Sequence, residues 1–179
     1  DFIARTQAVA AEVHEAYFRA ELGDVTEPTA PFGVLNVQGD GEQVREARVA
    51  LDASLAQRIR DTARRQGVTV AVLFHVAWAQ VVAQCSGRND VVFGTVLSGR
   101  LQGTEGADQV LGMFINSLPV RIALNDRNVR DVVSDTYRRL SGLLAHEQAS
   151  LALAQRCSGV PASLPLFTKL LNFRHSALV

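Results

Sequence analysis

Histidine is the side chain best suited to proton transfer near neutral pH, and each of the four histidines in this chain stands alone in the sequence. They are His14, His75, His146 and His175. Ser98 does not lie in a Gly-x-Ser-x-Gly nucleophile elbow, because residues 96 and 100 are Val and Arg. Spacing alone therefore brings no nucleophile, base and orienting group together, and we assign no catalytic residue.

Metal-ligand spacing is also missing from the sequence. His146-Glu147 begins like the zinc-helix motif His-Glu-x-x-His, but residue 150 is Ser. Cys85 and Cys157 match no zinc pattern and are too few for a disulfide framework, so we expect two reduced thiols. With no recognisable signal peptide, this favours a cytoplasmic protein that holds no metal and no cofactor of its own.

Composition is that of an ordinary globular domain. The chain has 179 residues, of which 47% are hydrophobic and 20% charged, and 18 basic residues balance 18 acidic ones. A disordered tail, a rod and a fibre are excluded. The balanced charge gives no electrostatic reason to expect nucleic acid or an anionic membrane as a partner.

The first third of the chain predicts helices joined by an irregular connector. Apolar spacing indicates a helix over 2–22, ended by Gly23. Residues 23–43 are rich in Gly and Pro and form the expected connector, and a loosely alternating strand should follow over 44–51. Asp52 is a candidate N-cap for the next helix, which Gly67 should end.

The remaining elements alternate between buried helices and strands. Residues 70–85 are apolar on nearly all sides, which predicts a buried helix with His75 as a hydrogen-bonded core residue. Thr69 is its candidate N-cap, and Gly87 should end it. The following elements are an inner strand over 90–97, a polar loop over 99–106, a strand region over 111–124 broken at Pro119, a long helix capped by Asn128, a loop over 159–165 and a last strand over 166–174. This order predicts an α/β layered sandwich.

Four segments, in their order and spacing, carry a family resemblance. They are residues 69–87 with Ala77-Trp78-Ala79, residues 90–100 (DVVFGTVLSGR), residues 112–121 (GMFINSLPVR) and residues 165–176 (PLFTKLLNFRHS). Together they resemble the C-terminal half of a nonribosomal peptide synthetase condensation domain. The resemblance covers nearly all of residues 1–179 and implies a lobe similar to chloramphenicol acetyltransferase, with a mixed sheet and flanking helices.

The resemblance also implies a function and partners. Condensation domains join two carrier-bound thioesters through an amide bond, in a tunnel between two lobes. The 4′-phosphopantetheine arms arrive on donor and acceptor peptidyl carrier proteins, and an adenylation domain is the expected neighbour. The family's His-His-x-x-x-Asp-Gly signature belongs to the N-terminal lobe. No two histidines are adjacent in this chain, so the lobe alone is expected to be inactive.

Supporting residues can be carried over from the family onto matching positions. Gly94, Ser98 and Gly99 lie in the segment that corresponds to the inter-lobe crossing, where small residues would admit a pantetheine arm or another backbone. Asn116 lies on a strand facing the tunnel region, and its amide would hold an arm or cap a broken strand. Arg100 is placed to pair with the signature aspartate of the other lobe.

Two kinds of alternative, enzymatic and non-enzymatic, stay open at the level of sequence. Asn172-Phe173-Arg174-His175-Ser176 departs from the commoner Phe-Glu-Asn ending and is closer to domains that also epimerise the donor residue. An epimerisation lobe, an ester-forming or acyl-transferring relative, or a dual epimerisation and condensation lobe would keep the same fold. A lobe that only docks carrier proteins, without catalysis, is the non-enzymatic alternative.

Overall fold

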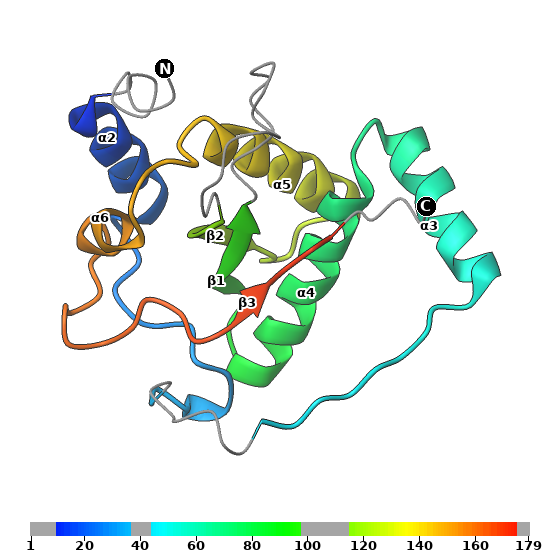
Figure 1. Ribbon diagram of the computed structural model, residues 1–179, viewed down its shortest axis with the longest axis horizontal. Helices are drawn as coiled ribbons and strands as arrows, with labels where there is room; N and C mark the ends of the chain where they lie inside the picture. Colours follow the sequence, from blue (N-terminus) through cyan, green and yellow to red (C-terminus); the bar gives the residue numbers. More distant parts are fainter. Residues whose placement is uncertain (1–9, 37–43, 98–114, 175–179) are drawn as a thin grey trace.

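The fold is a three-stranded mixed sheet flanked by helices, seen in a computed structural model that describes residues 10–36, 44–97 and 115–174. In chain order the elements are α2 (Ala11–Leu22), η1 (Pro31–Gly33), α3 (Ala53–Gln66), α4 (Val70–Ser86), β1 (Asp90–Leu97), β2 (Asn116–Ala123), α5 (Val129–Leu144), α6 (Leu151–Arg156) and β3 (Leu170–Leu171). Helices α4 and α5 pack on each other and on the sheet, α2 lies beside α6, and α3 lies at the opposite end of the molecule (Figure 1). The predicted α/β lobe is confirmed.

Strand β1 is the inner strand, as its apolar run predicted. It pairs with β2 antiparallel and with β3 parallel, so the strand order is β2-β1-β3. Five consecutive residues of β1, from Val91 to Thr95, are buried. Both faces of the strand are therefore covered, which explains why its sequence is continuously apolar rather than alternating.

The expected break at Pro119 is wrong. Strand β2 runs unbroken, and Pro119 lies opposite Gly94 in a regular register with β1. The N–H of Gly94 turns the other way and donates to the carbonyl of Lys169 at 2.9 Å. Residues opposite each other in an antiparallel pair exchange hydrogen bonds only at alternate positions. Pro119 occupies a position where β1 needs no donor, so its missing N–H costs the ladder nothing.

Two other strand predictions are corrected. Residues 44–51 form no strand, and Val44 and Val49 are 80% and 89% exposed, because no described segment pairs with them or buries one face. The last strand is reduced to Leu170–Leu171, with an isolated bridge between Thr29 and Phe167. Helix α6 was not predicted at all.

Most helix ends follow the predicted capping chemistry, but the side chain of Thr69 makes no capping hydrogen bond at the start of α4. Asp52 accepts a hydrogen bond from the N–H of Ser54 at 2.6 Å, and Asn128 accepts one from the N–H of Asp131 at 2.9 Å. Gly67 and Gly87 end α3 and α4 in the left-handed conformation, at φ values of 66° and 67°. The predicted first helix is seen as α2, and its residues 2–9 lie outside the described part of the chain.

Part of the predicted connector is packed into the lobe. The side chain of Thr29 is 2% exposed, and its Oγ1 accepts a hydrogen bond from the N–H of Val92 at 2.9 Å. The N–H of Thr29 in turn donates to the carbonyl of Leu166 at 3.1 Å. On this edge of β1, the carbonyl of Lys169, just before β3, accepts the hydrogen bond from Gly94, and the Thr29 hydroxyl accepts the one from Val92. The connector thus completes the pairing of the inner strand.

Within the described residues, no single helix is long and apolar enough to cross a membrane. Among these residues, only α3 and α4 taken together have the length and composition of a membrane span, and the two helices are bent by 106° at their junction.

Thr29→Val should lower the free energy of unfolding by about 1–3 kcal/mol, because the buried N–H of Val92 would lose the hydroxyl that accepts its hydrogen bond while side-chain volume is retained. The exposed Thr26→Val serves as the matched control and should change stability by less than about 0.5 kcal/mol. Chemical denaturation of both variants measures the difference. Equal stability of the two variants would contradict this role for Thr29.

Candidate functional site: the inner strand and its crossings

Gly94 lies where the C-terminal segment runs alongside the inner strand. A methyl group added at Gly94 would lie 2.1 Å from Cδ2 of Leu170 and 2.7 Å from Cε2 of Phe167. The family resemblance predicted that small residues here admit a pantetheine arm or another backbone. In the described residues that space is occupied by the side chains of Phe167 and Leu170, which come from the segment around β3. Ser98, Gly99 and Arg100, the other predicted residues of this crossing, lie outside the described residues.

Asn116 begins β2 and fixes the turn between α5 and α6. Its Nδ2 donates to the carbonyl of Glu147 at 2.7 Å and to the carbonyl of Ala149 at 2.8 Å. Its Oδ1 accepts from the N–H of Ser117 at 2.9 Å. Both amide hydrogens are thereby used on backbone carbonyls. The observed contacts are those of a positioning residue that ties the sheet to the turn.

Behind the inner strand, His75 of α4 is a hydrogen-bonded core residue, as the sequence predicted. The side chain is 4% exposed, its Nδ1 lies 2.7 Å from the carbonyl of Ala71, and its Nε2 lies 2.8 Å from Oγ1 of Thr95. A carbonyl can only accept, so Nδ1 carries the proton and Nε2 accepts from the threonine hydroxyl. Burial lowers the pKa of His75, which keeps the imidazole neutral. Thr95 follows Gly94 directly, so this pair anchors β1 at the crossing.

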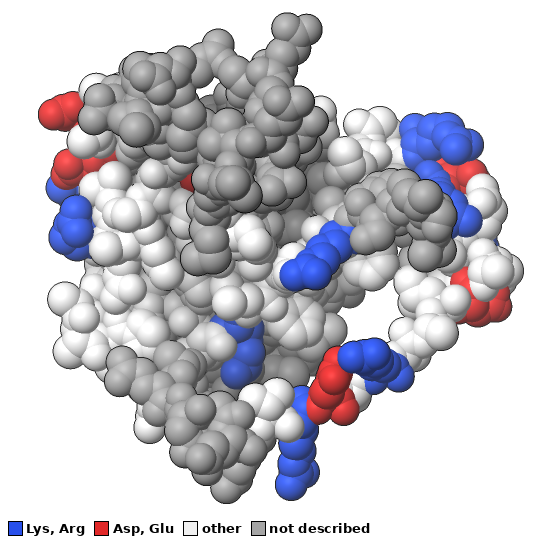
Figure 2. Space-filling view, viewed as in Figure 1, with Lys and Arg blue, Asp and Glu red and all other residues white. Residues whose placement is uncertain are grey.

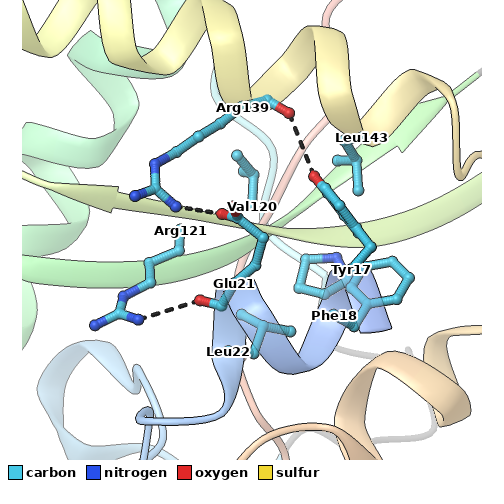
Figure 3. A pocket seen from close by; sticks show the side chains of 9 residues that line it. Tyr17, Phe18, Glu21, Leu22, Val120, Arg121, Arg139 and Leu143 are labelled. Carbon is cyan, nitrogen blue, oxygen red and sulfur yellow. Dashed lines mark hydrogen bonds and ion pairs between the residues drawn. The ribbon is translucent and has the colours of Figure 1, made fainter. Parts of the chain in front are cut away.

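A small hollow lies between α2, β2 and α5 (Figure 3). It is lined by Tyr17, Phe18, Glu21, Leu22, Pro119, Val120, Arg121, Arg139 and Leu143. Two arginines from different elements point into this region, and sequence spacing did not single them out. Their charges decide whether the hollow can bind an anion.

Both arginines of the hollow are already neutralised. Arg121 lies 2.6 Å from Asp90 and 2.5 Å from Asp24, and its Nη1 also donates to the carbonyl of Glu21 at 3.1 Å. The hydrogen bonds that Arg121 donates to Asp90 and then to Asp24 raise the pKa of Arg121. Arg139 pairs with Glu21 and, at 3.1 Å, with Asp135. These pairs bind α2, β1, β2 and α5 to one another, so the hollow is a structural joint.

Tyr17 completes the joint. Its hydroxyl donates to the carbonyl of Arg139 at 3.5 Å. Burial is the largest cause that raises the pKa of Tyr17, followed by the negative charge of Glu21. The phenol therefore stays protonated, and it offers a hydrogen-bond donor rather than a base.

Among the described residues on the face seen in Figure 2, side chains of one charge sign do not gather into a large patch. Basic and acidic side chains alternate over α3 and over the extended segment before it. Some are paired locally, as between Arg48 and Glu46 at 2.9 Å and between Arg64 and Asp61 at 3.3 Å. In the part of the chain that the structure describes, no three His, Cys, Asp or Glu side chains are grouped to hold a metal ion.

These observations define an α/β lobe whose inner strand is hydrogen-bonded on one edge to β2 and on the other edge to the connector and the C-terminal segment. The chain belongs to the condensation domain family, whose model matches residues 4–177.

Two large synthetases from Mortierella alpina are similar to this chain. Malpibaldin synthetase is 49% identical over 179 residues, which are 99% of this chain and 3% of that protein. Malpinin synthetase is 53% identical over 165 residues, or 92% of this chain and 2% of that protein. The chain therefore spans only a small part of the relatives it matches.

Solved condensation domains share the fold. The first condensation domain of the calcium-dependent antibiotic synthetase, in complex with a substrate analogue, matches with a TM-score of 0.73 and 23% identity, over 94% of this chain and 38% of that one. The condensation domain of the monacolin K polyketide synthase matches with a TM-score of 0.68 and 18% identity, over 95% of this chain and 44% of that one. At these identities the likeness concerns the fold alone.

Gly94→Ala should destabilise the lobe by about 1–3 kcal/mol, because the half-buried ring of Phe167 must shift to make room. Gly142→Ala is the matched control. A methyl group there meets Tyr17 no closer than 3.5 Å, an ordinary contact. In helix α5 it should be stabilising by about 0.5–1 kcal/mol. Denaturant midpoints of the two variants should shift in opposite directions, and a shift in the same direction would refute the crossing constraint.

Proposed function

We propose that this chain is the C-terminal part of a condensation domain that forms an amide bond between carrier-bound aminoacyl or peptidyl thioesters. The observation that carries the proposal is the family match over residues 4–177, since it covers both the inner-strand segment and the crossing segments. The identity to two synthetases from Mortierella alpina supports the same class of reaction.

In this reaction the amine of the acceptor thioester attacks the donor thioester carbonyl. A C–N bond forms, the C–S bond of the donor breaks, and the amine gives up a proton that ends on the released thiol. Both 4′-phosphopantetheine arms are delivered by donor and acceptor peptidyl carrier proteins, and a neighbouring adenylation domain loads them. The His-His-x-x-x-Asp-Gly signature that the family uses would be supplied by an N-terminal lobe.

This chain would contribute the positioning surface of the tunnel. Gly94, with its neighbours Ser98 and Gly99, would shape the crossing between the lobes, since Gly94 already accepts a close-packed segment. Asn116 would hold the turn after α5 in place through two backbone carbonyls. Neither role requires proton transfer, which agrees with the absence of two adjacent histidines from the sequence.

The proposal is tested by comparing this chain with the complete two-lobe domain, using carrier proteins loaded with defined aminoacyl thioesters. The complete domain should form a dipeptidyl thioester on the acceptor carrier, and the chain alone should give only background. Chiral analysis of the donor residue separates simple condensation from epimerisation. No dipeptide from the complete domain, or dipeptide from the chain alone, would contradict the proposal.

We also propose that Arg100 pairs with the signature aspartate of the other lobe. Arg100→Ala in the complete domain should then cost about 3–5 kcal/mol, because a buried carboxylate would be left without its partner. Arg58→Ala on the exposed face of α3 is the control and should cost about 0–1 kcal/mol. Denaturation and dipeptide formation measure both variants. Unchanged stability and turnover of Arg100→Ala would remove this residue from the site.

A further inference from the structure

Two histidines that are far apart in the sequence meet where α2 packs against the end of α5. Nδ1 of His14 lies 2.8 Å from Nδ1 of His146, and the side chain of His14 is 6% exposed. The ring of Tyr17 stacks on His146 with a centroid distance of 4.0 Å, and Phe18 contacts it edge-on. His146 thus packs against two aromatic side chains of α2 and remains partly exposed.

A hydrogen bond between two Nδ1 atoms limits how many protons the pair can hold. One imidazole must present an N–H and the other a lone pair. The bond exists when both rings are neutral or when one is protonated. If both are protonated, two N–H groups and two positive charges face each other and the bond is lost.

Charged and titratable side chains are present on the described elements around the pair, but apart from the effect of His14 on His146 none of them contributes to the lowered pKa values of the two histidines. They are Glu12, Glu15, Tyr17, Arg19 and Glu21 on α2, Arg139 on α5, Glu147 in the following turn and, after it, Arg156 and Cys157. Burial lowers the pKa of His14, and burial together with the charge of His14 lowers the pKa of His146. Among the described residues, the charge that opposes protonation of His146 is that of its partner.

We propose that the His14–His146 pair is an acid-sensitive clasp that fastens α2 to the α5–α6 turn at neutral pH and releases it when both imidazoles are protonated. The neighbouring contact between the Tyr17 hydroxyl and the carbonyl of Arg139 does not titrate in this range, because the pKa of Tyr17 is raised. Burial also raises the pKa of Glu147, the residue after His146, and the His14→Asn variant separates its titration from that of the histidine pair. Because both pKa values are lowered from 6.5, the clasp contributes its full stability above that pH. The contribution is lost as the pH falls below it.

Hydrogen exchange of the complete condensation domain, measured between pH 7.5 and 5.0 and corrected for intrinsic exchange, tests the clasp. Peptides of α2 should lose protection on acidification, because the bond that fastens α2 to the α5–α6 turn is absent once both imidazoles are protonated. Peptides of α3 provide an internal reference and should keep a constant protection. Constant protection of α2 over the whole range would overturn the proposal.

His14→Asn isolates the mechanism. The asparagine amide can donate to neutral His146 or accept from its protonated form, so α2 protection should become independent of pH. Tyr17→Phe is the matched control: it weakens the same seam without a titrating group, and the pH dependence should persist. A pH dependence that survives in His14→Asn would overturn the clasp. If that variant does not fold, histidine NMR of the wild type decides, because two coupled titrations below pH 6.5 are expected and independent ones would refute it.

Discussion

The hydrogen-bond requirement of β1 organises this lobe. Because the strand is buried on both faces, water cannot satisfy its backbone, and each edge must find protein partners. Strand β2 serves one edge along its whole length. The other edge is served by pieces: the Thr29 hydroxyl at Val92 and the carbonyl of Lys169 at Gly94. The connector and the C-terminal segment are therefore held in place by hydrogen bonds from the backbone of β1.

Local chemistry made much of the fold predictable. The ends of α3 and α4 were predicted from Asp52, Gly67 and Gly87, because caps act through neighbouring residues. The errors share a different cause. Whether 44–51 is a strand, and whether Pro119 breaks one, depends on which backbone lies alongside, and no local pattern carries that information.

The candidate site was likewise predictable only where local sequence determines it. A demand for small size at Gly94 could be predicted from its segment, but the identity of the neighbours that impose it, Phe167 and Leu170, could not. The aromatic and histidine contacts around His146 were also hidden, since His14 lies 132 residues away in the sequence. Single histidines look isolated in a sequence until the fold brings them together.

The parallel pairing of β3 with β1 has a consequence for synthesis on the ribosome. Gly94 pairs with Leu170, so β1 must wait for a distant part of the chain before this edge is closed. Helix α4, β1 and β2 emerge earlier and can form first. During that interval the nascent chain presents an open strand edge, the kind of surface that recruits other strands. A large loop must then be closed to cover it, which makes this docking a slow, late event in folding.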